Sequence, residues 1–264
     1  MYNFKITMPD QRYIDLNSDV GEVHPINGDN HDAEIMPFIS SCNICCGFHS
    51  SDAQLIYKTV QTAIKYKLAI GAHPSFRDRK NFGRKFLKQD PDTLMADILY
   101  QIGAVKTMVE QAGSRLNHVK AHGALYHYIQ NDGDIAIQYL RLLKSIDDSL
   151  KVVGMPGTPL EKMALELNMS FIAEVFADRH YENRTTLRSR SEQGALIIGE
   201  IDIKKRIEDI LQGIIIDFYG HKHKITADTI CLHSDTEGSI KLAELIHKTL
   251  KHQNISISSN GPGN

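Results

Sequence analysis

Short apolar runs alternate with longer amphipathic stretches along most of this chain. Seven of the short runs favour β-strands, because turn-forming residues bound them and they are too short for buried helices. They span residues 13–17, 38–44, 68–73, 118–122, 151–155, 170–176 and 229–233. Amphipathic patterns predict helices at 52–66, 91–112, 133–146, 159–168, 202–215 and 238–252. Strands that alternate with helices predict an α/β fold with a parallel sheet, either open or closed into a barrel.

The pattern gives no reason to divide the chain into domains. We find no internal repeat, low-complexity linker or block of like charge along the 264 residues. This length falls in the range of a single α/β barrel domain. We therefore expect one domain over residues 1–264, with loose termini at 1–12 and 258–264.

Polar residues recur at the carboxyl ends of the predicted strands. In a strand, residues two apart share one face, so these side chains can be aligned. They are Asp15, Asn17 and Asp19 from the first segment, Asn43 and His49 from the second, His73 from the third, Lys120 and His122 from the fourth, Glu174 and Asp178 from the sixth, and His233 from the last. Active sites of parallel α/β folds lie at this end of the strands. The repeated feature therefore predicts a polar catalytic cup.

The groups gathered in this cup are carboxylates, imidazoles and one ammonium. Such groups suit proton transfer and the stabilisation of an anionic intermediate, and the chain is rich in histidine, with 13. A single polar residue on an apolar strand is usually a hydrogen-bonded core group, so the prediction depends on the repetition. Arg84, Arg179 and Arg190 could grip a carboxylate or phosphate; the alternative is three surface ion pairs.

Composition excludes several other classes of protein. The net charge of −2 gives no reason to expect a nucleic-acid or acidic-membrane partner. No apolar run approaches the ~20 residues of a membrane span, and the N-terminus does not have the pattern of a signal peptide. The four cysteines do not form the spacing of a disulfide framework, which favours a reducing compartment. We expect a cytoplasmic protein.

The sequence leaves a metal site undecided. Histidines and carboxylates converge, but there is no H-E-x-x-H motif. His118 and His122 would lie ~13 Å apart on an extended strand, too far for one ion. The metal ligands, if any, are unknown at this point.

Six segments, which follow one another along nearly the whole chain, closely resemble the LamB/YcsF family. They are IDLNSDVGE (14–22), SSCNICCGFHSSDA (40–53), GAHPSFRDRKNFGR (71–84), HVKAHGALYH (118–127), EVFADRHYENRTTLRSRSEQGAL (174–196) and ICLHSD (230–235). Ala121, His127 and Arg184-Thr185 depart from the usual family pattern.

The resemblance implies a fold and an activity. The fold would be a seven-stranded parallel β/α barrel like that of the glycoside hydrolase/deacetylase superfamily, here a single catalytic domain. The activity would be that of an ATP-dependent 5-oxoprolinase, which opens the lactam of 5-oxo-L-proline to L-glutamate. ATP would be a co-substrate, together with Mg²⁺, and the partners would be the 5-oxoprolinase subunits B and C.

The family's motif positions also imply site residues. Catalytic roles would fall to Asp15, His73, Lys120, His122, Glu174 and His233. Substrate-binding roles would fall to Asn17, Asp19, Asn43, His49, Asp52, Arg84, Tyr126, Asp178, Arg179 and Arg190.

Two alternatives remain open at this stage. The first is a metal-dependent deacetylase or related amide hydrolase, which would contain bound zinc and act without ATP. The second is a non-catalytic subunit that only binds substrate, in which the polar cup would hold a ligand but its acids and bases would not affect the rate.

Overall fold

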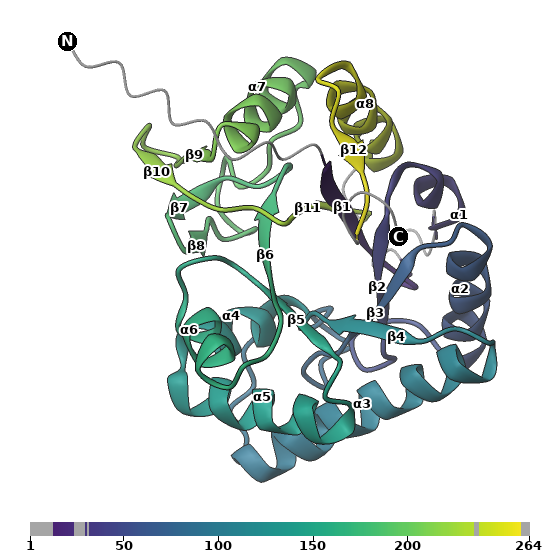
Figure 1. Cartoon of the computed structure of the whole chain (residues 1–264). Helices are drawn as coiled ribbons and strands as arrows, with labels where there is room; N and C mark the ends of the chain where they lie inside the picture. The colour runs from purple at the N-terminus through teal and green to yellow at the C-terminus, as the bar shows by residue number, and fades with distance from the viewer. Residues whose placement is uncertain (1–12, 24–29, 31, 235–237, 260–264) are drawn as a thin grey trace.

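Seven parallel strands form a closed ring in the computed structural model, which describes residues 13–23, 30, 32–234 and 238–259 (Figure 1). The ring contains β1 (Tyr13–Val20), β2 (Ser41–Cys45), β3 (Ala69–His73), β4 (Leu116–Val119), β5 (Lys151–Gly154), β6 (Phe171–Phe176) and β11 (Thr229–His233). Neighbours in the ring follow chain order, and β11 pairs with both β6 and β1, which closes the sheet. The predicted seven-stranded parallel β/α barrel is therefore confirmed.

Helices surround this ring (Figure 1). They are α1 (Asp32–Ile35), α2 (Ala53–Lys65), α3 (Pro91–Gln111), α4 (Gly123–Asn131), α5 (Gly133–Ile146), α6 (Pro159–Glu166), α7 (Glu200–Leu211) and α8 (Ser239–His252), with a 3₁₀ turn, η1, at Met36–Phe38. The six predicted helices are all present, whereas α1, α4 and η1 were not predicted. In the described part of the chain, no helix combines the length and the apolar character needed to cross a bilayer.

Local chemistry explains where the main helices begin. The Asp90 carboxylate accepts a hydrogen bond from Thr93 N (3.1 Å), and Pro91 occupies the first turn of α3. Asp132 caps α5 in the same way, through Asp134 N and Ile135 N. Each helix then buries an apolar stripe against the barrel. In α3 the buried apolar residues are Leu94, Ile98, Ile102, Val105 and Val109.

Short strands outside the ring were not predicted. Between β6 and β11 the chain forms two antiparallel hairpins, β7 (Tyr181–Asn183) with β8 (Thr186–Leu187), and β9 (Ile214–Ile216) with β10 (Lys222–Lys224). The strand β12 (Ser256–Ile257) pairs with the start of β1. Ser258 N also donates to Ile14 O (3.1 Å), so the tail predicted to be loose from 258 is paired at its first residue. Residues 1–12 and 260–264 lie outside the described residues.

The strand predicted at 118–122 ends earlier, at Val119. Gly123 has a left-handed φ of +56°, and a Cβ there would lie 2.6 Å from Gly83 O. The chain therefore turns at this point, and His122 becomes the N-cap residue of α4. The two candidate site residues of this segment, Lys120 and His122, lie on the turn that follows the strand.

Inside the barrel, one glycine leaves room for a histidine ring. An added Cβ at Gly71 would lie 2.2 Å from His118 Nε2. The His118 imidazole is held in place because its Nε2 is hydrogen-bonded to Asn43 Oδ1 (2.9 Å). Gly71 is thus required by close packing within the barrel.

We expect Gly71→Ala to destabilise the protein by about 1–3 kcal/mol, because the ring of His118 must move away from its bonded position. Gly103 is the matched control, since nothing lies within 4 Å of its added Cβ on α3. Gly103→Ala should be neutral or stabilising by up to about 1 kcal/mol. Urea unfolding of both variants tests this, and an equal effect at the two sites would contradict it.

Asp32 joins the end of β1 to α2. Its Oδ2 accepts from Gly21 N (2.7 Å), Asn30 Nδ2 (2.8 Å) and Thr59 Oγ1 (3.2 Å). Burial raises the pKa of Asp32 to about 6, although these three donors oppose the shift.

This shift predicts a pH-dependent stability. The folded-state pKa of about 6 lies above the ordinary value of 3.8, so the folded protein binds more protons between these values. The free energy of unfolding should therefore fall by about 2–3 kcal/mol, from this group alone, as pH rises from about 4 to about 6.5. Asp32→Asn keeps an acceptor oxygen but does not titrate. Urea unfolding across this range should show the stability of the wild type falling relative to this variant; a constant difference would contradict the assignment.

Candidate active site

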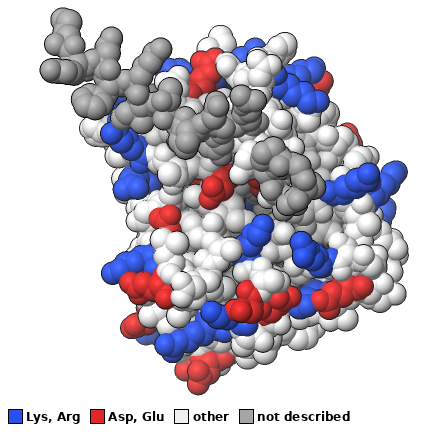
Figure 2. Space-filling view, viewed as in Figure 1, with Lys and Arg blue, Asp and Glu red and all other residues white. Residues whose placement is uncertain are grey.

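A cavity of about 800 Å³ opens at the carboxyl ends of the barrel strands. Its polar and charged lining includes Asp19, Glu22, His73, Arg84, Lys120, His122, Tyr126, Arg179, Arg188, Arg190 and His233. Phe86, Tyr128 and Phe176 add aromatic surface. Of the residues that were aligned in the sequence, the structure thus brings five to this cavity, namely Asp19, His73, Lys120, His122 and His233. On the face of the molecule shown in Figure 2, acidic and basic side chains are interspersed and neither sign of charge predominates.

A buried ammonium lies at the base of this cavity. Lys120 Nζ is 3.0 Å from Asp19 Oδ1 and 2.7 Å from Glu174 Oε1. Tyr126 donates to the other oxygen of Glu174 (2.7 Å). Burial alone would lower the pKa of Lys120, but the neighbouring carboxylates raise it well above its usual value. Lys120 is therefore a permanent positive charge and not a proton acceptor.

Asp19 is the corresponding permanent anion. Burial works against its charge, but His73 and Lys120 lower its pKa well below the usual value. Its Oδ1 accepts from Lys120 and from Asn43 Nδ2 (2.9 Å), and its Oδ2 lies 3.2 Å from His73 Nε2. Oδ1 of this carboxylate thus faces Lys120 and Asn43, and Oδ2 faces His73.

Three histidines pack together on one wall of the barrel mouth. The rings of His49 and His122 are stacked, with centroids 3.8 Å apart and an interplanar angle of 4°. His73 meets the ring of His122 edge-on, with Nε2 3.0 Å from His122 Nδ1. Burial, followed by the neighbouring imidazoles, lowers the pKa of both His49 and His122 well below the usual value, so these rings are neutral.

Glu22 joins this histidine cluster, although the sequence did not single it out. Its Oε1 lies 2.7 Å from His49 Nε2 and 3.3 Å from His122 Nδ1. The only signal in the sequence was its place directly after Gly21, which follows the polar first strand. In the structure, Gly21 has a left-handed φ of +73° at the end of β1. A carboxylate just beyond a polar strand end is a candidate for this edge of a barrel.

A separate pair forms at the end of β11. His233 Nδ1 lies 3.0 Å from Asp178 Oδ2, and the backbone N of His233 donates to the same oxygen (3.1 Å). Although burial opposes its charge, the pKa of Asp178 is lowered, mainly by His233. A carboxylate on Nδ1 fixes the ring so that Nε2 is the nitrogen left for chemistry. His233 lines the cavity, whereas Asp178 supports it from behind.

The arginines line the outer part of the cavity. Arg84 comes from the loop after β3, and Arg179 and Arg190 come from the segment that contains the β7–β8 hairpin. Arg179 Nη2 donates to Arg188 O (2.5 Å), which ties the base of this segment together. Arg188 also lines the cavity and was not predicted. Several guanidinium groups around one cavity favour an anionic ligand.

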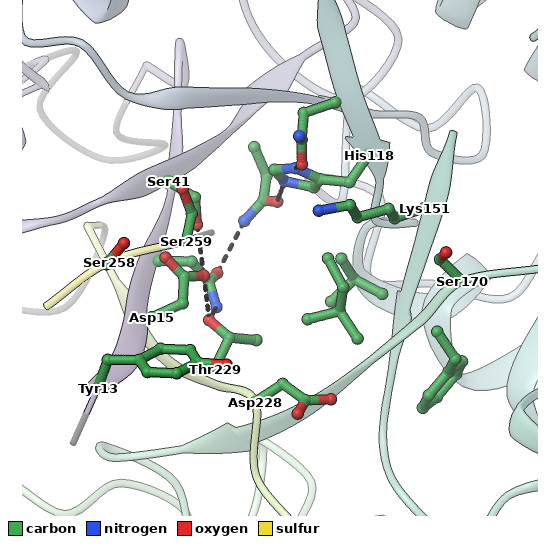
Figure 3. A pocket seen from close by; sticks show the side chains of 16 residues that line it. Tyr13, Asp15, Ser41, His118, Lys151, Ser170, Asp228, Thr229, Ser258 and Ser259 are labelled. Atoms are coloured by element: carbon green, nitrogen blue, oxygen red, sulfur yellow. Dashed lines mark hydrogen bonds between the residues drawn. The ribbon is translucent and has the colours of Figure 1, made fainter. Parts of the chain in front are cut away.

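Asp15 does not lie in this cavity, in contrast to the prediction. It lines a smaller cavity of about 330 Å³ at the amino ends of the strands. Figure 3 shows it beside Ser41 and Thr229, across the opening from His118 and Lys151. The error has a simple physical origin, because residues that share a strand face can still be far apart. Asp15 and Asp19 are four residues apart on β1, which corresponds to ~13 Å at ~3.3 Å per residue.

Hydroxyl groups surround the Asp15 carboxylate. It accepts from Ser40 Oγ (2.5 Å), Ser41 Oγ (2.6 Å) and Thr229 Oγ1 (2.6 Å). Burial nevertheless raises its pKa. These contacts describe a carboxylate that holds together the starts of β1, β2 and β11, away from the main cavity.

Six other predicted residues do not line the main cavity. Three of them, His49, Glu174 and Asp178, contact residues that line it. Asn17 and Asn43 occupy the middle of the barrel, where Asn43 Nδ2 donates to Asn17 Oδ1 (2.8 Å) and Asn17 Nδ2 donates to Thr229 Oγ1 (2.7 Å). Asp52 is exposed and caps α2 by accepting from Leu55 N (2.9 Å). The aspartate of this motif therefore begins a helix instead of facing the cavity.

Several donor groups could hold a metal ion. Asp19, His73 and His122 offer ligand atoms within 4.8 Å of one another, and so do Glu22, His49 and His122. A third group contains Asp19, Cys231 and His233. Residues that the sequence analysis could not connect thus converge in the barrel mouth. All four cysteines are buried and free, in line with the absence of a disulfide framework.

Comparison with known proteins identifies close relatives. The model of the LamB/YcsF family matches residues 14–262. The A subunit of the 5-oxoprolinase of Bacillus cereus is 39% identical over 246 residues, which cover 92% of this chain and 97% of the relative. The protein of the same name from Acinetobacter baylyi is 39% identical over 247 residues, which cover 93% of this chain and 97% of that protein.

Solved structures agree with this result. The crystal structure of the lactam utilization protein from Thermus thermophilus has a TM-score of 0.86 and 33% identity, covering 94% of this chain and 99% of that chain. A putative cellobiose-phosphate cleavage protein from Enterococcus faecalis has a TM-score of 0.54 at 12% identity, covering 94% of this chain and 97% of that chain, and shares the fold alone.

The buried ammonium gives a stability prediction. Lys120→Ala should cost about 3–5 kcal/mol of unfolding free energy, because it leaves the Asp19 and Glu174 charges buried without their cation. Lys106 is the matched control, since it pairs with Glu110 and Asp147 at the surface. Lys106→Ala should cost about 1 kcal/mol or less. Urea unfolding at neutral pH measures both, and similar costs would show that the Lys120 pair is not buried as described.

Proposed function

The chain belongs to the LamB/YcsF family, and we propose that it is the subunit of an ATP-dependent 5-oxoprolinase in which the lactam of 5-oxo-L-proline is opened to L-glutamate. The observation that carries the proposal is the main cavity, in which a permanent ammonium, a set of arginines and a carboxylate-held histidine face one space. The names of the relatives, which describe a 5-oxoprolinase component and a lactam utilization protein, supply the substrate class.

The chemistry of a lactam explains why these groups are needed. Amide resonance protects an unstrained five-membered lactam against water. Transfer of the γ-phosphoryl group of ATP to the lactam oxygen, with loss of the ring N–H proton, would remove that resonance and release ADP. Water can then add to the ring carbon, and the ring C–N bond breaks as nitrogen takes up the two protons of that water, which leaves an acyl phosphate. A second water hydrolyses the acyl phosphate to the side-chain carboxylate of L-glutamate and phosphate. The site must supply proton transfer and positive charge for the oxygens that become anionic.

The positive charges of the cavity suit the phosphoryl and carboxylate groups. Lys120 remains an ammonium in its pocket of carboxylates, and it faces the base of the cavity. Arg84, Arg179 and Arg190 line the outer part, where paired N–H donors can hold planar or tetrahedral anions. We assign the carboxylate of 5-oxoproline and the transferred phosphoryl group to these residues.

His233 is our candidate for the proton-transfer group. Asp178 holds its Nδ1 and leaves Nε2 for the cavity, which is the arrangement of a general base. Its ring also stacks on Phe176, with centroids 5.6 Å apart. Phe176 and Lys120 form a shared floor, since the ammonium lies 5.6 Å from the ring centroid. An apolar lactam ring over this floor would have its polar edge near His233.

The cavity is larger than a small lactam requires. Its volume of about 800 Å³ is in the range of sites for much larger ligands. This supports a second reactant beside 5-oxoproline, and we propose ATP with Mg²⁺ as that co-substrate. We further propose that the chain works with the 5-oxoprolinase subunits B and C, because the names of its relatives designate one component of a larger enzyme.

Reconstitution tests this function. The full chain mixed with subunits B and C should form ADP and L-glutamate from ATP and 5-oxo-L-proline, and omission of the chain should abolish glutamate formation. His233→Ala should lower the rate by about 10²–10⁴-fold, because it removes the proposed general base. His247→Ala is the control, since His247 lies on α8 and bonds to Phe38 O (2.9 Å). It should retain the wild-type rate.

Two results would contradict the proposal. A complete, well-folded set of subunits without 5-oxoproline-dependent ADP formation would reject the 5-oxoprolinase assignment. A wild-type rate in His233→Ala would reject the role of this residue, and would favour a subunit that binds substrate without catalysing its conversion.

A further inference from the structure

The outer nitrogens of His73 and His122 are both bound to backbone carbonyl groups. His73 Nδ1 lies 2.7 Å from Lys120 O, and His122 Nε2 lies 2.8 Å from Phe82 O. A carbonyl oxygen only accepts hydrogen bonds, so each of these nitrogens must carry the ring proton. In a neutral imidazole the second nitrogen is then a bare lone pair, namely Nε2 in His73 and Nδ1 in His122.

These two lone pairs face each other. His73 Nε2 and His122 Nδ1 are 3.0 Å apart, a distance at which the two nitrogens cannot face each other without a proton or a cation between them. Asp19 Oδ2 lies 3.2 Å from His73 Nε2, and Glu22 Oε1 lies 3.3 Å from His122 Nδ1. Four acceptor atoms therefore converge on one point, and all four residues are buried. Only a positive charge between them makes this arrangement favourable.

We propose that Asp19, His73 and His122 bind a divalent transition-metal ion, with Glu22 at its side. A tetrahedral ion with ligands at ~2.0–2.1 Å separates neighbouring ligand atoms by ~3.3 Å, close to the spacings found here. Two imidazoles and a carboxylate are the donors that zinc and its first-row neighbours prefer, whereas Mg²⁺ and Ca²⁺ prefer oxygen.

The surroundings of the ligands support a metal site. The carbonyl groups of Lys120 and Phe82 fix the orientation of both rings, as outer acceptors do for metal-bound histidines. Lys120 and Asn43 bind Oδ1 of Asp19 and leave Oδ2 toward the histidines. Three protein ligands and a position open to the cavity are typical of catalytic metal sites.

The position of the ion indicates what it could contact. All its ligands line the main cavity, so an oxygen of a bound substrate or a water molecule could reach the open position. Binding of the ion requires only these four side chains, whether or not the chain takes part in opening a lactam. Metal binding and 5-oxoprolinase activity can therefore be tested separately.

Zinc binding by the full chain is the direct test. Protein stripped with a chelator and dialysed against ZnCl₂ should retain about one zinc ion per chain by elemental analysis. His73→Gln and His122→Gln should each lower the zinc affinity by at least about 100-fold, since loss of a supporting residue alone costs about 10–100-fold. His118→Gln is the control, because it removes another buried imidazole that bonds to Asn43. It should keep the zinc.

A measurement on the wild type guards against variants that fail to fold. Co²⁺ added to the stripped wild-type chain should give the intense visible absorption of a four-coordinate site, and X-ray absorption at the zinc edge should show imidazole scattering. No stoichiometric zinc in the wild type would overturn the proposal and leave an extra proton between His73 and His122 as the positive charge. Undiminished zinc binding in both glutamine variants would overturn it as well, and neither outcome depends on turnover of 5-oxoproline.

Discussion

The ammonium of Lys120 between two buried carboxylates is the interaction on which the barrel interior depends. Asp19 comes from β1, Glu174 from β6, and Lys120 from the turn after β4, so one charged group joins three sides of the ring. Each of these charges would be unstable in the barrel without the others, because a buried ion costs several kcal/mol unless it is paired. Together they allow a polar interior where most domains have an apolar one.

Hydrogen-bonded layers extend from this pair through the barrel. Asn17 and Asn43 connect Asp19 and Lys120 to the amino end, where Asp15 is surrounded by hydroxyl groups. Polar side chains inside a barrel must satisfy one another, since water has little access. The amino half is therefore a structural support, whose bonds fix the positions of the residues that face the main cavity.

The carboxyl half of the barrel carries positive charges in addition to Lys120, which pairs with the buried carboxylates. Arg84, Arg179 and Arg190 line the outer part of the cavity, while His233 is held by Asp178. The loop that carries Phe82 and Gly83 packs on the start of α4, where it positions His122. The residues proposed for anion binding, for proton transfer and for the metal ion thus occupy different parts of one cavity, as the proposed reaction of two reactants would need.

The sequence by itself determined the order of strands and helices, because strand and helix periods and helix caps are local properties. The local patterns left the closure of the sheet into a barrel open, because it depends on the pairing of β11 with β1, two strands far apart in the chain. The seven barrel strands and the six predicted helices follow from such patterns, and Asp90 and Asp132 show the local capping chemistry. It also indicated that polar residues gather at the strand ends. Only the tertiary structure decided which of these residues meet, since strand register and the direction of turns depend on contacts distant in the chain. Asp15 lies at the opposite end because four residues along a strand cover ~13 Å. Glu22 entered the site because Gly21 turns the chain toward His49, and the facing nitrogens of His73 and His122 arise from carbonyl groups in other segments.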